Sequence, residues 1–166
     1  MLPNSQQCHA LASEWINAFN HSLTAAPHSP DAACNLFLAD SYWRDALGVT
    51  WQLDTMVGGD AIVTALRENA NRVGLSDLSL DDTASPPQWV NRASTDAIEA
   101  FFRFETKAAI GRGIVRLCPT TKPTEAGNTD RQWRAWTLFT AIDQLKGHEE
   151  KLDRNRPTGS SYSRDF

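Results

Sequence analysis

The sequence is poor in cysteine, has no excess of positive charge and contains no long apolar run. Its three cysteines, Cys8, Cys34 and Cys118, are odd in number and widely spaced. They are a poor basis for disulfides and favour a reducing, cytoplasmic setting. Sixteen basic and twenty acidic residues give a formal charge of -4, so the basic surface that nucleic acid or an anionic membrane requires is missing. No apolar run approaches membrane-spanning length, and residues 1–6 do not resemble a signal peptide. We therefore predict no nucleic-acid partner, no membrane partner and no targeting segment.

The sequence also gives no indication of a metal site or a large cofactor. The four histidines are scattered, and neither they nor the cysteines have the spacing of metal ligands or of a catalytic Ser-His-Asp or Cys-His set. No Gly-x-Gly-x-x-Gly segment opens a βαβ unit, so the phosphate cradle of flavin and nicotinamide cofactors is missing. We predict no metal and no cofactor.

Length and composition are those of one domain with a tail. The 166 residues are 41% hydrophobic and 22% charged, enough to bury a full core without disulfides or a metal. Almost nothing after Gly147 is apolar, and residues 156–159 read Arg-Pro-Thr-Gly, a composition typical of a linker. We predict one domain over residues 1–147 and an extended C-terminal tail over residues 148–166.

Helical periodicity dominates the first half of the chain. Apolar residues recur every three or four positions in residues 8–19, after a predicted cap at Ser5. A serine, a proline and an aspartate open a short predicted helix over residues 29–39. The glycine pair that begins at Gly58 leads into a third apolar stripe over residues 62–73.

Strand periodicity begins at residues 41–45 and dominates the second half. Further strands are predicted over residues 98–106, 114–118, 133–142, 78–80 and 88–91. Together these elements predict an α+β fold, in which about three N-terminal helices pack on a curved antiparallel sheet. We expect a cone that encloses a pocket.

Residues 36–48 contain the main candidate for chemistry. Their short strand ends on Asp45, and because side chains alternate, Trp43 and Asp45 share one face while Tyr42 and Arg44 take the other. If the first face looks into a cavity, Asp45 is a carboxylate in an apolar wall, an environment that suits a general acid or base. The alternative is a strand-end carboxylate bonded to water or to nearby backbone. For Arg44 we predict a structural ion pair or a subunit contact.

The remaining candidates divide between a pocket and the outer surface. Six tryptophans and seven phenylalanines indicate a large aromatic interior, either a filled core or an apolar pocket. Arg116 and Arg134 lie on neighbouring predicted strands and could hold an anionic substrate if they face inward. Glu99, Arg103 and Glu105 alternate to the opposite face from the phenylalanines of their strand. We predict exposed ion pairs for these three.

Several blocks of the sequence resemble a known superfamily. In residues 36–45 a leucine, a phenylalanine, a small residue, an acid, a strand and a final aspartate follow one another. This order resembles the nuclear transport factor 2-like (NTF2-like) superfamily, which includes ketosteroid isomerase, scytalone dehydratase and polyketide cyclases of the SnoaL type. The resemblance spans roughly residues 8–146 and implies an α+β cone. It places Asp45 where the isomerase carries its catalytic base, and Trp15 where the isomerase has an oxyanion-stabilising tyrosine.

A closer resemblance is to the N-terminal domain that precedes the FAD domain in many flavin-containing monooxygenases. It rests on residues 40–45, 50–55 and 136–150, three blocks in the same order. This chain shows no FAD-binding fingerprint, so the resemblance implies an NTF2-like domain without the flavin domain.

These observations predict a cofactor-independent enzyme of small-molecule secondary metabolism, with Asp45 performing acid–base catalysis on a hydrophobic substrate. An isomerase, a cyclase or a dehydratase (lyase) would fit. The residues predicted to bind the substrate are Trp15, Trp43, Trp51, Asp54, Phe102, Phe104, Arg116 and Trp136. The alternative is a non-catalytic ligand-binding or interaction domain derived from a flavin monooxygenase, docking a separate flavoprotein. The resemblance also predicts a homodimer through the outer sheet face, with Phe101, Arg103 and the strand over residues 133–139.

Overall fold

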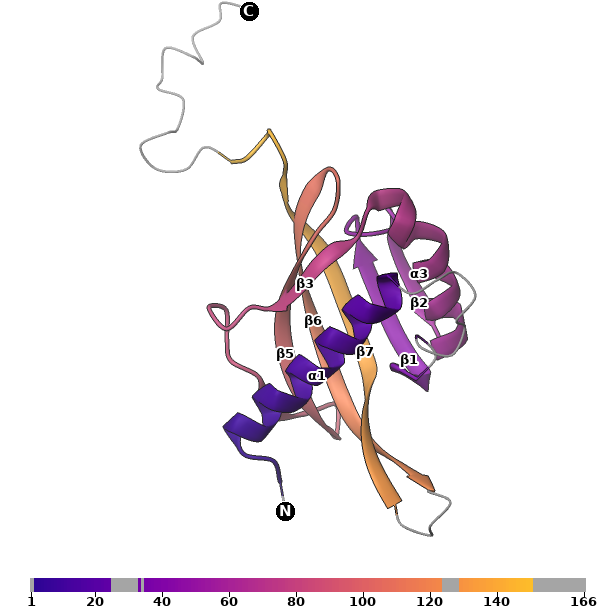
Figure 1. Cartoon of the computed structure of the whole chain (residues 1–166), viewed down its shortest axis with the longest axis vertical. Coiled ribbons are helices and arrows are strands. Elements are labelled where there is room, and N and C mark those ends of the chain that lie inside the picture. The colour runs from indigo at the N-terminus through magenta and orange to yellow at the C-terminus, as the bar shows by residue number, and fades with distance from the viewer. Residues whose placement is uncertain (1, 25–32, 34, 124–128, 151–166) are drawn as a thin grey trace, which may run out of the picture.

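A computed structural model describes residues 2–24, 33, 35–123 and 129–150. Figure 1 shows a long helix lying across a curved sheet, with a second helix at one end of that sheet. The elements in chain order are α1 (Ser5–Thr24), β1 (Phe37–Ala46), β2 (Leu53–Val57), α3 (Gly59–Val73), β3 (Ser76–Leu80), β4 (Gln88–Arg92), β5 (Thr95–Glu105), β6 (Ala109–Pro123) and β7 (Thr129–Leu145). The predicted tail lies outside the described residues from position 151 onward.

The sheet is mixed, which corrects the prediction of an antiparallel sheet. Its strands follow the order β2-β1-β7-β6-β5-β3, and β4 pairs with the part of β5 that β3 leaves uncovered. The predicted meander of β5, β6 and β7 is antiparallel. β1, however, runs parallel to β7, with Asp45 opposite Thr140. Alternation within a strand says which side chains share a face but not which strand lies beside it, so the sequence could not reveal this pair.

Helix α1 begins with a reciprocal cap formed by Asn4 and Gln7. The backbone N–H of Gln7 donates to Oδ1 of Asn4, and the N–H of Asn4 donates to Oε1 of Gln7, both at 2.9 Å. This is a capping-box arrangement, in which the cap satisfies two free backbone donors. The predicted cap at Ser5 was therefore wrong by one residue. The predicted stripe is confirmed, since Ala12, Trp15, Ile16 and Phe19 are buried.

The chain has two helices in its described part, α1 and α3, where about three were predicted. Of the predicted helix over residues 29–39, positions 29–32 and 34 lie outside the described residues. At its expected end the chain is already extended, because β1 begins at Phe37 and pairs with Ala135 of β7. The Leu36-Phe37 pair is apolar in either periodicity, so the pattern could not fix this boundary.

Helix α3 forms where the third apolar stripe predicted it and packs against β1 and β2. It begins after Gly58, whose φ is 94°, and ends at Gly74 in the left-handed conformation, a frequent helix terminator. Strand β2 was not predicted, because its five residues are exposed or only half-buried and show no alternation. It pairs with β1 as one edge of the sheet.

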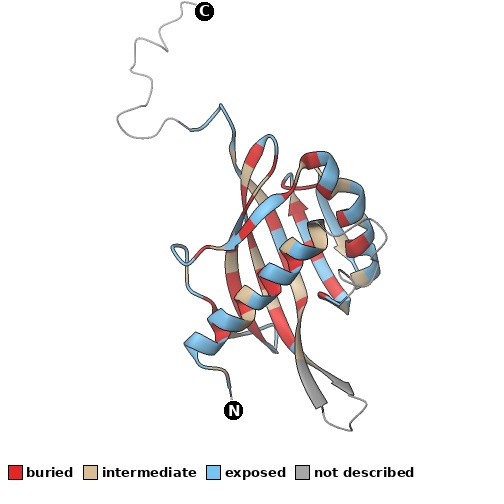
Figure 2. Cartoon of the chain, viewed as in Figure 1, coloured by how far each residue is buried: buried red, intermediate tan, exposed pale blue. Residues whose placement is uncertain are grey.

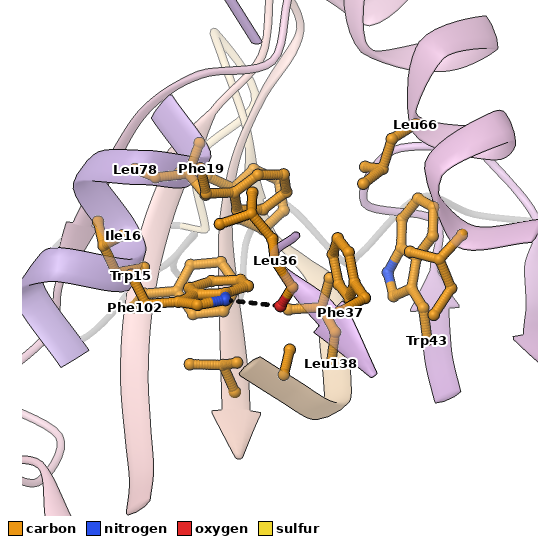
Figure 3. Close-up of a cluster of buried hydrophobic side chains, with 14 of the residues drawn as sticks. Trp15, Ile16, Phe19, Leu36, Phe37, Trp43, Leu66, Leu78, Phe102 and Leu138 are labelled. Atoms are coloured by element: carbon orange, nitrogen blue, oxygen red, sulfur yellow. Dashed lines mark hydrogen bonds between the residues drawn. The ribbon is translucent and has the colours of Figure 1, made fainter. Parts of the chain in front are cut away.

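Aromatic rings occupy the space between α1 and the sheet. Buried positions alternate with exposed ones along the strands (Figure 2). In the centre Phe37 packs edge to face against both Trp15 and Phe19, whose own rings are tilted by 51° (Figure 3). On β5, Phe102 and Phe104 lie directly opposite two glycines of β6. A β-carbon on Gly113 would lie 2.2 Å from the ring of Phe102, and one on Gly111 would lie 2.1 Å from the ring of Phe104. The two glycines thus make room for rings that fill the concave side of the sheet.

Candidate functional site

Asp45 is completely buried at the end of β1, with 0% of its surface exposed. Trp43 is also buried, whereas Tyr42 and Arg44 are exposed, so the predicted alternation of the two faces is confirmed. The carboxylate therefore points toward the interior, beside Trp43. What it can do there depends on its hydrogen-bond partners.

Five donor groups surround the Asp45 carboxylate. The backbone N–H of Gly48 donates to Oδ1 at 3.1 Å, that of Val49 to Oδ2 at 3.1 Å, and that of Thr50 to Oδ2 at 2.7 Å. The hydroxyl of Thr50 donates to Oδ2 at 2.6 Å. A carboxylate offers about four lone-pair directions, so these donors together with Thr140 occupy them all.

Thr140 connects the carboxylate to the indole of Trp43. Its hydroxyl accepts a hydrogen bond from Nε1 of Trp43 at 2.8 Å and donates one to Oδ1 of Asp45 at 2.5 Å. A hydroxyl can do both at once, because it has one proton and two lone pairs. The result is a fully satisfied polar chain inside the core, the only form in which such groups are buried at little cost.

The same carboxylate holds the turn between β1 and β2 in its unusual shape. Leu47 and Trp51, on either side of the bonded amides, have φ angles of 65° and 61°. Non-glycine residues rarely adopt this left-handed conformation, which persists only where surrounding contacts stabilise it. Asp45 supplies those contacts, and in this arrangement it is a structural anchor. This corresponds to the backbone-bonded alternative in the sequence analysis.

The other predicted pocket residues do not converge on Asp45. Phe102 and Phe104 are buried in the core against their glycines, whereas Trp51 is exposed in the turn. Asp54 is exposed, and its Oδ1 accepts the N–H of Thr55. Trp136 lies half-buried at a bulge of β7, opposite the step from Arg116 to Leu117 of β6.

Arg116 faces the outer side of the sheet, and Arg134, which pairs with Cys118 two positions further along β6, lies on the same face. The condition for their predicted role in holding a substrate, that they face inward, is not met. The Nε of Arg116 donates to Oε2 of Glu99 at 2.7 Å, and Arg92 donates to the same carboxylate. The hydrogen bonds from Arg92, assisted by Arg116, lower the pKa of Glu99. Glu99 is therefore a buried ion-pair residue and not an exposed one as predicted. Arg103 and Glu105 do form outer ion pairs, with Asp81 and Lys146.

A groove beside helix α1 brings together residues that the sequence did not connect. It lies between α1, the residues just before β1 and the beginning of β7, and it has a volume of about 370 Å³. We call it the α1–β7 groove. Of the predicted residues it contains Trp15, whose Nε1 donates to the carbonyl of Leu36 at 3.0 Å (Figure 3). The groove is lined by Leu11, Glu14, Trp15, Ala18, Asn35, Leu36, Gln132 and Trp133.

Aromatic packing fixes the far wall of this groove. Trp133 makes an edge-to-face contact with Trp89 of β4, with ring centroids 6.1 Å apart. Sequence reasoning assigned Trp133 to a dimer surface and passed over Glu14, Asn35 and Gln132, because the groove forms from segments about 100 residues apart. In contrast, the spacing of Asp45, Gly48 and Thr50 is a local signal for an aspartate-bonded turn that could have been recognised.

Two further properties of the described residues bear on the site. No three histidine, cysteine, aspartate or glutamate side chains come close enough there to hold a metal ion. Neither of the two described helices is long and apolar enough to cross a membrane.

Comparison with known proteins identifies the fold. No protein-family model and no curated protein sequence matches the chain. Among solved structures, an NTF2-like superfamily protein from Salmonella enterica serovar Typhimurium is 14% identical, with a TM-score of 0.51 over 93% of this chain and 99% of that one. A steroid delta-isomerase from Pseudomonas aeruginosa is 15% identical (TM-score 0.42; 89% and 87% covered), and a hexachlorocyclohexane dehydrochlorinase, LinA type 2, is 10% identical (0.43; 90% and 93%).

The Salmonella structure shows that this chain has the NTF2-like α+β fold, as the resemblance implied. A shared fold does not by itself transfer an activity. The relation to the N-terminal domains of flavin monooxygenases stays a prediction.

Proposed function

We propose that this domain binds a small apolar molecule in the α1–β7 groove without a cofactor, and that Asp45 serves the fold. This is the ligand-binding alternative of the sequence analysis, moved from the centre of the cone to its flank. The composition of the groove carries the proposal. Leu11, Trp15, Leu36 and Trp133 supply its large apolar side chains, and Glu14, Asn35 and Gln132 supply its polar ones.

Glu14, Asn35 and Gln132 give this groove a larger polar share than most ligand sites, which are mostly apolar and measure roughly 300–1,000 Å³. At about 370 Å³ the groove suits a small ligand. A larger hollow of about 540 Å³ lies between Asn20 and β3. It has no aromatic wall, and the Asn20 amide is already bonded to both the N–H and the carbonyl of Leu78. We therefore favour the α1–β7 groove.

The experiment uses N-phenyl-1-naphthylamine, an apolar dye that fluoresces when it leaves water. We expect it to bind the wild-type protein saturably. Ala18→Trp should abolish binding, because Ala18 is an exposed residue of α1 that lines the groove, and an indole there would fill it. Asn17→Trp is the matched control, since Asn17 is the exposed neighbour that does not line the groove. Equal dye binding by Ala18→Trp and wild type would refute the proposal.

An acid–base enzyme centred on Asp45 is the second candidate. It is favoured by the complete burial of Asp45 on the inner face beside Trp43. A substrate would have to displace donors of the turn at residues 48–50 before it could reach the carboxylate. The test is untargeted mass spectrometry of a metabolite extract incubated with wild type or with folded Asp45→Asn protein. An enzyme converts a metabolite only with the wild type, whereas a binding domain leaves every metabolite unchanged.

We also propose that the domain forms a homodimer through the outer face of its sheet. Phe101, Ile114 and Phe139 lie opposite one another across β5, β6 and β7, and Tyr42 and Val57 continue the apolar surface on β1 and β2. Tyr42, Val57 and Phe139 are 47%, 59% and 37% exposed. Arg44 lies among them, opposite Phe139. Exposed apolar side chains grouped on one face together with an arginine are typical of an interface. Trp133, predicted to belong to this surface, lies in the groove instead.

A further inference from the structure

Arg134, next to the α1–β7 groove, has an unusual set of partners. Its Nη2 donates to Oδ1 of Asn35 at 3.3 Å and to Oε1 of Gln132 at 3.2 Å. Its Nε is buried and has no hydrogen-bond partner. Among the described residues, every other buried side-chain nitrogen or oxygen has at least one partner. Buried polar groups are nearly always bonded, so an exception calls for an explanation.

The charge of Arg134 is also left without a carboxylate in the described part of the chain. Four other arginines of the sheet pair with acids: Arg103 with Asp81, Arg112 with Asp143, and both Arg92 and Arg116 with Glu99. Arg44 of β1 bonds the neutral Thr55 instead, but it is exposed to water. Arg134 forms no such pair, although arginine stays protonated in proteins. Placing a half-buried cation with only neutral partners is unfavourable unless another group balances it.

Nearby acids do not fill this role. Cys118 lies opposite Arg134 across β6 and β7. Burial first, and then the charges of Asp40 and Asp96, raise the pKa of the Cys118 thiol, so both carboxylates are close to this part of the sheet. Neither forms an ion pair with Arg134.

The two partners of Arg134 are themselves walls of the groove. Asn35 and Gln132 line it, and both turn their amide oxygens to the guanidinium. Arg134 itself lies on the outer face of the sheet, opposite Cys118, and its positive charge reaches the groove through the amides of Asn35 and Gln132. Glu14 lines the groove as well, but it is exposed on α1, where water screens it and its side chain can turn away.

We propose that the ligand of the α1–β7 groove is a small aromatic carboxylate, with its apolar ring against Trp15 and Trp133 and its carboxylate at the Asn35–Gln132 rim in front of Arg134. This inference rests on the proposed function. It adds the chemical class of the ligand: the carboxylate balances the Arg134 charge and accepts hydrogen bonds from the rim, and the guanidinium is well shaped for that role.

The experiment compares two probes of equal shape, 2-naphthoate and its neutral amide, 2-naphthamide. Each competes with N-phenyl-1-naphthylamine for the wild-type protein. We expect 2-naphthoate to bind at least tenfold more tightly than 2-naphthamide. Arg134→Gln should remove that preference and leave the affinity for 2-naphthamide unchanged. Arg134→Lys should keep part of the preference, because it keeps the charge but not the planar fork.

Arg44→Gln is the control, because Arg44 is an exposed arginine of the outer face bonded to Thr55, and its loss should leave the preference intact. Equal affinity of the wild type for the two probes, or a preference for 2-naphthoate that persists in Arg134→Gln, would overturn this inference but leave the groove supported as a binding site. Failure of the dye itself to bind in the groove overturns the proposed function, and this inference with it. Should Arg134→Gln not fold, the comparison rests on the wild-type preference and on Arg134→Lys.

Discussion

The Thr140 hydroxyl donates a hydrogen bond to Asp45 across the one parallel strand pair of the described sheet, and the two residues lie 95 positions apart in the sequence. This contact joins the last strand to the turn that follows the first one. The Asp45 carboxylate thus connects the turn at residues 48–50, which is close in sequence, to strand β7, which is distant in sequence. Its role can be tested through stability.

Asp45→Asn should lower the free energy of unfolding by about 3 kcal/mol. The amide replaces one acceptor oxygen by a donor group, which then faces the donating amides of Gly48, Val49 and Thr50. Urea unfolding followed by circular dichroism measures the loss. Asp54→Asn is the matched control, because Asp54 is exposed on β2, and we expect a change below about 0.5 kcal/mol. Equal stability of the two variants would contradict the anchoring role.

Gly113→Ala should destabilise the protein by about 2 kcal/mol, because its β-carbon would overlap the ring of Phe102 and the main-chain oxygen of Phe139. The decisive measurement is a double-mutant cycle with Phe102→Leu, which removes the ring. We expect the alanine to cost clearly less in the Phe102→Leu background than in the wild type. Strictly additive effects would show that the ring does not occupy the space over Gly113.

The free energy of unfolding at acid pH should depend on the ion pair formed by Asp81 and Arg103. The hydrogen bond from Arg103, followed by that from Thr83, lowers the pKa of Asp81 to about 2 from an ordinary 3.8. A carboxyl whose pKa is depressed by folding stabilises the protein above its unfolded pKa. That contribution is lost as the pH falls through the folded pKa.

We therefore expect the wild type to be more stable than Asp81→Asn at pH 6, with a difference that shrinks between pH 4 and pH 2. Urea unfolding at closely spaced pH values measures it. Glu99 also has a lowered pKa, caused first by the hydrogen bond from Arg92. Its contribution is the same in the wild type and in Asp81→Asn, so it does not affect the difference in their stability. A difference that stays constant down to pH 2 would contradict the assignment.

Phe139→Arg should convert a dimer into a monomer. Phe139 belongs to the outer apolar surface and lies opposite Arg44 of β1, so an arginine there would be buried beside a like charge in the two-fold complex. Multi-angle light scattering at micromolar concentration measures the mass. Thr64→Arg, on the exposed side of α3, is the control and should stay dimeric. A wild-type protein that is monomeric under these conditions would refute the interface.

The sequence predicted those features that depend on local periodicity. The stripes of α1 and α3 and the meander of β5, β6 and β7 follow from positions three, four or two apart, and the structure confirms them. The direction of β1 beside β7 and the existence of β2 depend on which distant segment lies alongside, and no pattern within the segments records it. The same limit applies to Asp45. Its burial beside Trp43 followed from alternation, whereas its bond to Thr140 required the fold.

Sequence separation also explains why the α1–β7 groove was not foreseen. Glu14 and Trp15 come from the first helix, while Gln132 and Trp133 come from the last strand. Each of these residues, considered alone, is an ordinary surface or core residue. The groove becomes visible only when the two ends of the domain are brought together.

The parallel pairing of β1 with β7 has a consequence for synthesis of the protein in the cell. A ribosome adds roughly 5–20 residues per second, so roughly 5–20 seconds pass between the emergence of Asp45 and that of Thr140, 95 residues later. During this interval the edge of β1 that will receive β7 has no partner, and Trp43 lacks its hydroxyl acceptor. An open apolar strand edge is a target for chaperones and for other nascent chains. The open edge of β1 is therefore covered only at the end of synthesis, when β7 pairs with it.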